Sequence, residues 1–168
     1  LPITILRYFN VYGPRQSLSN PYTGVSAIFT SRLKNNKPPV IYEDGLQTRD
    51  FVSVKDIVKV NLLCLNSPSS NYQIFNVGTS QPKPVKYLAE FTNNYLKKDI
   101  NPKITNKFRK GDVRHCIADI SKLKNKLDFS PEISFEEGMK EFFSWSEKEE
   151  AEDKFEQATS ELKEKGLI

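Results

Sequence analysis

Short apolar runs of strand length alternate with segments of helical periodicity along this chain, and this alternation limits its fold more than any other feature. Residues 3–6 have the length of a strand, and apolar residues at helical spacing follow at 25–33. Strands that alternate with helices indicate an α/β architecture with parallel connections, and the helix-rich end indicates a smaller lobe. Further strands are predicted at residues 40–42, 49–54, 73–77 and 102–105, and further helices at 57–65, 85–96, 120–127 and 135–145.

Three of the predicted helices begin at side chains that cap helices well. Ser53 precedes the second helix, Asp119 directly precedes the fourth, and Ser134 with Glu137 forms a capping box before the last. These residues fix where the helices start.

Two elements carry expectations about burial. The helix at 57–65 is nearly all apolar, so we expect it to be largely buried. Residues 49–54 alternate between polar and apolar side chains, which predicts one half-buried strand.

Composition limits the class of protein. A chain of 168 residues that is 38% apolar and 27% charged is long enough for one domain with a hydrophobic core. No leader-like segment is present and no apolar run approaches about 18 residues, so we predict a cytoplasmic protein with no membrane partner. Cys64, Cys116 and the single His115 lack the spacing of metal ligands, so neither a metal nor a disulfide is predicted.

Charge is unevenly distributed along the chain. Residues 1–131 hold 20 Lys and Arg against 9 Asp and Glu, whereas residues 132–168 hold 5 against 12. A basic body suits an anionic small molecule such as a diphosphate as well as it suits nucleic acid, and the plainest interpretation is lysines on solvated helix faces. Because basic and aromatic residues do not interleave as in RNA-binding motifs, no nucleic-acid partner is predicted.

The segment 146–168 differs in composition from the rest of the chain. It consists mostly of Glu, Lys, Ala, Gln and Ser, and its large apolar residues are Phe155, Leu162, Leu167 and Ile168. We predict a charged helical tail, either an extra surface helix or a frayed end, with a structural role.

Four short segments place polar side chains beside turns, where a scaffold presents binding groups. They are residues 8–10, 49–50, 76–78 and 109–112. Two arginines on separate loops can converge on a diphosphate, because a guanidinium offers paired donors to phosphate oxygens, while an Asp nearby suits a ribose hydroxyl. The same patterns also occur in ordinary salt-bridged turns, so the residues alone indicate only a possible anion site.

Five motifs occur in a fixed order: RYFNVYGPR at 7–15, IYEDGLQTRDFVSVKD at 41–56, FNVGT at 75–79, RKGD at 109–112 and DISK at 119–122. In this order they resemble the C-terminal half of the extended short-chain dehydrogenase/reductase enzymes that act on nucleotide sugars, most closely UDP-glucose 4-epimerases. The resemblance implies the C-terminal portion of an extended Rossmann-type fold, with the last sheet strands and a small substrate-binding lobe in residues 1–145.

The resemblance also implies roles for individual residues. Tyr8 and Phe9 would lie beside the nicotinamide end of NAD, as cofactor-binding residues. Seven residues would bind a nucleoside diphosphate sugar, of the UDP-sugar type. They are Asn10 at the diphosphate or sugar, Val40 and Tyr42 at the base, Arg49 and Arg109 at the diphosphate, Asp112 at the ribose, and Asn76 in the same pocket.

Three residues depart from the pattern of these enzymes. Ser53 stands where an aromatic residue or His is common, Glu43 where Gly is usual, and Asp128 where Gly often follows a helix. The first two positions are expected near the nucleotide pocket, and the third is expected to affect only stability.

Two features of the complete enzymes are absent from the sequence. The seven glycines are widely spaced, so no glycine-rich dinucleotide fingerprint occurs, and no Tyr is followed by Lys four residues later. The resemblance places both features before Leu1, and we expect a fragment that is inactive alone.

We therefore predict the substrate-binding half of an NAD-dependent nucleotide-sugar 4-epimerase. In the complete enzyme, a hydride leaves sugar C4 for NAD, the keto sugar rotates, and the hydride returns to the opposite face. Alternatives are a fragment of a 4,6-dehydratase or decarboxylase, and a noncatalytic nucleotide-sugar-binding module. The missing N-terminal half is a predicted partner, and a homodimer is possible at full length.

Overall fold

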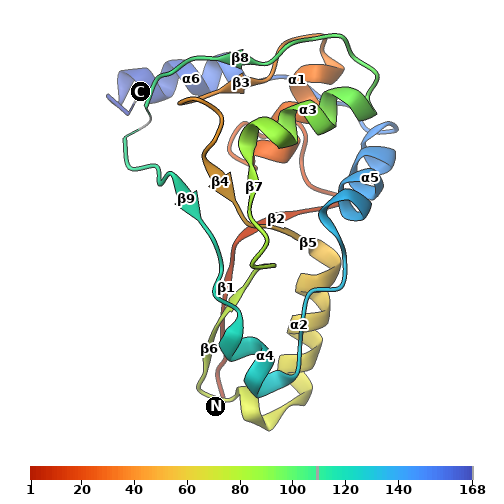
Figure 1. The fold of residues 1–168 in the computed structure, drawn as a ribbon, viewed down its shortest axis with the longest axis vertical. Helices are drawn as coiled ribbons and strands as arrows, with labels where there is room; N and C mark the ends of the chain where they lie inside the picture. The colour runs from red at the N-terminus through yellow and green to blue at the C-terminus, as the bar shows by residue number, and fades with distance from the viewer. Residues whose placement is uncertain (109, 168) are drawn as a thin grey trace.

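The computed structural model describes residues 1–108 and 110–167, which form an elongated α/β molecule with a helical upper lobe and a smaller lower lobe (Figure 1). No helix in this described part of the chain is long and apolar enough to cross a membrane. The elements in order are β1 (Ile5–Tyr8), β2 (Asn10–Tyr12), α1 (Val25–Lys34), β3 (Val40–Ile41), β4 (Thr48–Arg49), β5 (Phe51–Ser53), α2 (Val54–Asn66), η1 (Pro68–Ser70), β6 (Ile74–Val77), β7 (Lys83–Pro84), α3 (Val85–Tyr95), β8 (Lys103–Ile104), β9 (His115–Cys116), α4 (Ser121–Leu127), α5 (Phe135–Ser146) and α6 (Phe155–Glu164).

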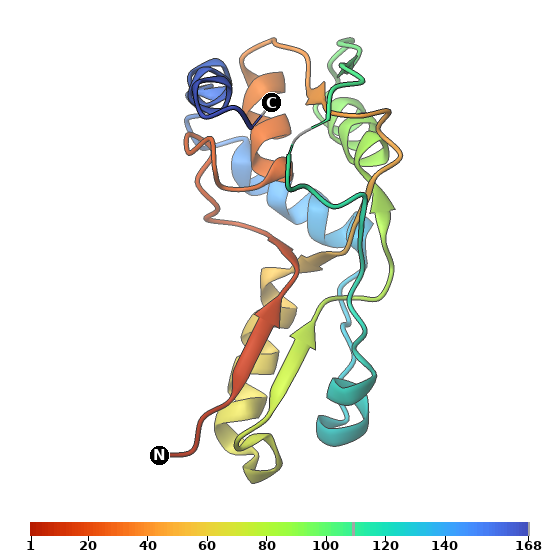
Figure 2. The ribbon, with the colours of Figure 1, turned by 90° about the vertical axis from the view of Figure 1, so that its left-hand side faces the viewer.

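The lower lobe is built on one parallel strand pair. β1 pairs with β6, with Ile5 opposite Ile74 and Tyr8 opposite Val77, and the two strands lie side by side in Figure 2. Helices α2 and α4 cover this pair, and a core that includes Val60, Phe75 and Leu123 fills the space between them.

The upper lobe has a separate core rich in aromatic residues, formed by α1, α3 and α5. Tyr12, at the end of β2, is buried there, and its hydroxyl donates a hydrogen bond to the Phe135 carbonyl at 3.4 Å. Burial, aided by the charge of Asp56, raises the pKa of the Tyr12 phenol. A Cβ at Gly138 would lie 2.3 Å from the Tyr12 hydroxyl, so α5 needs a glycine at this crossing.

The two lobes meet at the buried carboxylate of Asp50, between β4 and β5. Its Oδ1 accepts hydrogen bonds from the Thr79 amide at 2.7 Å and hydroxyl at 2.6 Å, and its Oδ2 accepts from the amides of Ser80 at 2.9 Å and Ala118 at 3.0 Å. A Cβ at Gly78 would lie 2.8 Å from Oδ2, so this glycine permits the close approach. One side chain thus joins three segments that are distant in the sequence.

The capping predictions are confirmed at Ser53 and Ser134. Ser53 accepts a hydrogen bond from the Lys55 amide, and Ser134 with Glu137 forms the full capping box. The prediction for Asp119 is off by one residue: Ile120 is the cap of α4, and the Asp119 carboxylate accepts from the Ser121 amide at 2.9 Å.

Two predictions about local structure are wrong. Residues 49–54 are not one half-buried strand, because the chain leaves β4 at Asp50 to bury its carboxylate, and all of β5 is buried. Helix α2 is not largely buried either: Val58, Leu62 and Leu65 are 52%, 55% and 81% exposed. These three side chains lie on the part of the helix surface that the lower core does not reach.

The Asp50 junction yields a stability prediction. Asp50→Asn replaces a charged acceptor of four hydrogen bonds with an amide whose NH₂ group must face one or more N–H donors. We expect the free energy of unfolding to fall by about 3 kcal/mol, measured by urea denaturation. Asp99→Asn, on an exposed residue after α3, is the control and should change it by less than about 0.5 kcal/mol. An equal, small effect of both substitutions would contradict the role given to Asp50.

Candidate functional site

A cavity of about 340 Å³ lies in the upper lobe, bordered by β2, α1, β3, β4 and α6. Its volume falls within the range of about 300 to 1,000 Å³ that is common for small-molecule sites. Five of the side chains predicted to bind the substrate line this one cavity: Asn10, Val40, Tyr42, Arg49 and Asp112.

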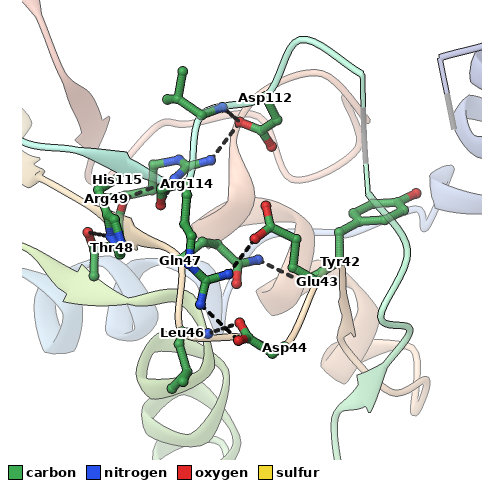
Figure 3. Close-up of polar contacts among 11 residues, drawn as sticks. Tyr42, Glu43, Asp44, Leu46, Gln47, Thr48, Arg49, Asp112, Arg114 and His115 are labelled. Atoms are coloured by element: carbon green, nitrogen blue, oxygen red, sulfur yellow. Dashed lines mark hydrogen bonds and ion pairs between the residues drawn. The ribbon is translucent and has the colours of Figure 1, made fainter.

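Arg49 is a charged group of this cavity that is held by its strand and by three hydrogen bonds. Its strand, β4, lies between β7 and β9, so neighbours on both sides fix its backbone. Its guanidinium donates from Nη2 to Asp112 Oδ1 at 2.6 Å, and from Nη1 to the carbonyls of Thr48 at 2.9 Å and Arg114 at 3.2 Å (Figure 3). Nε–H and one Nη2 hydrogen have no acceptor within the described residues, so they can serve an anionic ligand.

A second charged group supports the turn that follows β3. Arg114 donates from Nη1 to Glu43 at 2.7 Å and from Nη2 to Asp44 at 2.8 Å (Figure 3). Glu43, which stands where Gly is usual, has a φ of 52°. Its backbone therefore occupies the left-handed region that favours glycine, and its side chain is used in the ion pair instead of the cavity.

Gln47 is a cavity residue that the sequence reasoning did not single out. It is only 6% exposed, and its Nε2 donates to the Tyr42 carbonyl at 2.8 Å. Its Oε1 is buried without a hydrogen-bond partner among the described residues. A buried, unpaired acceptor is costly in the absence of a donor, so this oxygen suits a ligand that brings an N–H or O–H group.

Three other predicted site residues, Tyr8, Phe9 and Asn76, do not line the cavity. Tyr8, at the end of β1, is held by hydrogen bonds between its hydroxyl and Asn61 of α2, and Phe9 packs against the lower core. Asn76 donates to the Asp119 carbonyl at 3.3 Å. Arg109 lies outside the described residues. The roles predicted for these four residues stay predictions.

The sequence of this chain matches one protein family over most of its length. The sequence profile described as GDP-mannose 4,6 dehydratase covers residues 1–142. The chain belongs to the NAD-dependent epimerase/dehydratase family. This match confirms the family predicted from the five ordered motifs, and the structure itself confirms the predicted α/β fold.

Individual members of the family show the same likeness. The chain is 36% identical over 144 residues to a dTDP-L-rhamnose 4-epimerase of Burkholderia thailandensis, covering 86% of this chain and 39% of that protein. It is 39% identical to a putative UDP-glucose 4-epimerase of Methanocaldococcus jannaschii, covering 84% and 44% of the two chains. A crystal structure of UDP-glucose 4-epimerase from Thermotoga maritima with UDP-glucose superimposes with a TM-score of 0.80 at 40% identity, over 88% of this chain and 47% of that chain.

The chain thus spans less than half the length of these relatives. Other matching members of the family are decarboxylases and dehydratases, so the likeness alone extends across several reactions. Matching structures of a UDP-glucuronic acid 4-epimerase, a dTDP-glucose 4,6-dehydratase and a UDP-glucose 4-epimerase hold NAD.

The residues of this chain fit one end of NAD. The carboxyl ends of parallel strands are where α/β sheets bind nucleotides, and Tyr8 stands at such an end, with an aromatic ring fixed by Asn61. Tyr8 and Phe9 are the residues that would border a nicotinamide, and the sequence offers no glycine-rich turn for the dinucleotide phosphates. Within residues 1–108 and 110–167, no cluster of His, Cys, Asp and Glu is arranged to hold a metal ion.

The Arg114 contacts predict a measurable pKa change. The hydrogen bond from Arg114 lowers the pKa of Asp44, with help from the Leu46 amide. Arg114→Ala should raise the pKa of Asp44 toward 3.8, as followed by the carboxyl ¹³C shift in an NMR titration. In Arg49→Ala, which removes the partner of Asp112 instead, the pKa of Asp44 should stay where it is. An unchanged Asp44 pKa in Arg114→Ala would contradict the ion pair.

Proposed function

We propose that this chain is the substrate-binding half of an NAD-dependent nucleotide-sugar 4-epimerase and that the upper cavity holds a nucleoside diphosphate of the UDP type. The observation that carries the proposal is the convergence of the Arg49, Asp112 and Gln47 side chains on one cavity of about 340 Å³. Members of the family with 30–40% identity act on nucleotide sugars, which supports this ligand class.

Each lining group has a chemical counterpart in such a ligand. The Arg49 donors that remain after its three contacts suit the diphosphate, and the Asp112 carboxylate suits the ribose hydroxyls. Val40 and Tyr42 form an apolar and aromatic border for the base, and Asn10, at the start of β2, borders the sugar end.

The lower lobe supports the proposal that a further half packs against this chain. Among the described strands, β1 pairs only with β6, which leaves its other edge open. Leu6 and Tyr8 point toward α2, so Ile5 and its partner Ile74 face the opposite side, where they are exposed. An open parallel edge flanked by exposed apolar side chains suits the remainder of a Rossmann-type sheet. We propose that this remainder carries the dinucleotide fingerprint and the Tyr-x-x-x-Lys pair.

In that complete protein, bound NAD would supply the hydride acceptor and donor for sugar C4. The part played by this chain is positional. Arg49 and Asp112 hold the nucleotide by its diphosphate and ribose, which leaves the keto sugar free to turn between the two hydride transfers.

The second candidate is a 4,6-dehydratase or decarboxylase that uses the same binding half. It is favoured by a 31% identical UDP-N-acetyl-alpha-D-glucosaminuronate decarboxylase of Bacillus cytotoxicus, matched over 86% of this chain. The products separate the classes: with the full-length protein and UDP-sugars, an epimer of unchanged mass supports the epimerase, whereas loss of water or carbon dioxide supports the alternative.

Calorimetric titration of this chain with UDP tests the binding site. We expect saturable binding that Arg49→Ala weakens at least about tenfold, because charge-assisted hydrogen bonds to a diphosphate are lost. Arg15→Ala is the matched control, since Arg15 is an exposed arginine outside the cavity. No binding by the unaltered chain, or equal affinity of the three proteins, would refute the proposed site.

A further inference from the structure

Helix α6 forms a wall of the nucleotide cavity although it lies beyond the residues matched by the family profile. Four of its side chains line the cavity: Phe155, Ala158, Thr159 and Leu162. Their spacing places them on one face of the helix, while Glu156, Gln157, Ser160, Lys163 and Glu164 are exposed. The segment 146–168 was expected to have a structural role only, and its position at the cavity suggests more.

Four ion pairs, of which Arg32–Asp153 is buried, fix the start of α6 to α1. Arg32 is only 4% exposed, and its Nη1 contacts Asp153 at 3.3 Å and Glu156 at 2.9 Å. Its guanidinium carbon lies 4.4 Å from the centre of the Phe155 ring. Lys37 reaches the same two carboxylates at 3.0 and 3.3 Å. The acidic tail is therefore bound to the basic end of α1, which places the apolar side of α6 against the cavity.

The far end of α6 is tied to the segment that carries Asp112. The Leu167 carbonyl accepts a hydrogen bond from the Lys110 amide at 2.9 Å. On the other side, the Tyr22 hydroxyl donates to Glu161. The tail thus contacts the segments that contribute Tyr22 and Asp112 to the cavity, and these contacts hold α6 in place as one of its walls.

The chemistry of this wall suits a base more than a phosphate. Its face is apolar apart from Thr159, whose hydroxyl has no hydrogen-bond partner among the described residues, and it offers no charge to a diphosphate. The buried Gln47 oxygen on the same cavity needs a donor, which a nucleobase N–H or a ribose hydroxyl provides and a fully ionised diphosphate does not.

We propose that α6 is the base-binding wall of this site, with Leu162 and Phe155 packing against the nucleobase while Arg49 holds the diphosphate. This inference rests on the proposed function, because it assigns the base end of the same cavity. Under this assignment, the tail contributes to nucleotide affinity and does more than form a structural surface helix.

Calorimetric titration of the full 168-residue chain with UDP and with inorganic pyrophosphate tests the assignment. Leu162→Trp places a large ring in the base end, so UDP should bind at least about tenfold more weakly, while pyrophosphate affinity stays within about twofold. Ser160→Trp, on the exposed side of α6, is the matched control and should leave both affinities within about twofold. Leu162→Ala, which removes packing without filling the cavity, should weaken UDP by about threefold or more.

The outcomes separate this inference from the proposed function. If UDP binds in an Arg49-dependent manner but both Leu162 variants bind it as tightly as the unaltered chain, the base wall is refuted and the site remains. If Leu162→Trp weakens UDP and pyrophosphate equally, α6 acts on the whole site and the base assignment is also refuted. If the unaltered chain fails to bind UDP, the proposed function and this inference fall together.

Discussion

The buried carboxylate of Asp50 is the interaction on which the rest of this structure depends. A charge without water is tolerated only when hydrogen bonds replace its hydration, and four donors from Thr79, Ser80 and Ala118 do so. Because these donors come from segments that follow β6 and β9, the hydrogen bonds to this one side chain fix the position of one lobe relative to the other. Arg49 precedes Asp50 in the chain, so the same junction fixes where the binding guanidinium emerges.

The lower lobe has apolar side chains that the folding of this chain leaves exposed to solvent. Exposed apolar side chains on α2 lie in the same lobe as an edge of β1 that no described strand pairs with. In the family to which the chain belongs, members are more than twice as long as the matched region. We propose these surfaces as the contact area of a dinucleotide-binding half, with Tyr8 and Phe9 next to the proposed boundary.

Sequence reasoning predicted the elements whose signals are local. The capping box at Ser134 and the cap at Ser53 indicate directly where two helices begin. The helical spacing of apolar residues predicted the bounds of α1 and α3 to within a residue or two. The sequence did not predict that the strand is interrupted at Asp50. The alternation of polar and apolar residues is the same whether the Asp50 carboxylate faces solvent or is buried by hydrogen bonds from distant amides. The burial of α2 was predicted wrongly because the apolar content of a helix does not show whether another part of the same chain packs against each of its faces. Five of the predicted binding residues line one cavity, as the resemblance implied. Gln47 and α6 also line this cavity, but no local sequence signal indicated it, because their positions depend on contacts between segments that are distant in the sequence.

A single cavity thus combines an arginine fixed in a small sheet, a carboxylate, an unpaired amide oxygen and an apolar helix face. We propose that these groups hold the two ends of one nucleoside diphosphate. A crystal structure of this chain with UDP tests the claim most directly. The account predicts the diphosphate at the Arg49 guanidinium and the base between β3 and α6, with a hydrogen bond to Gln47 Oε1. UDP bound elsewhere on the chain, or in this cavity with its base away from α6, would contradict it.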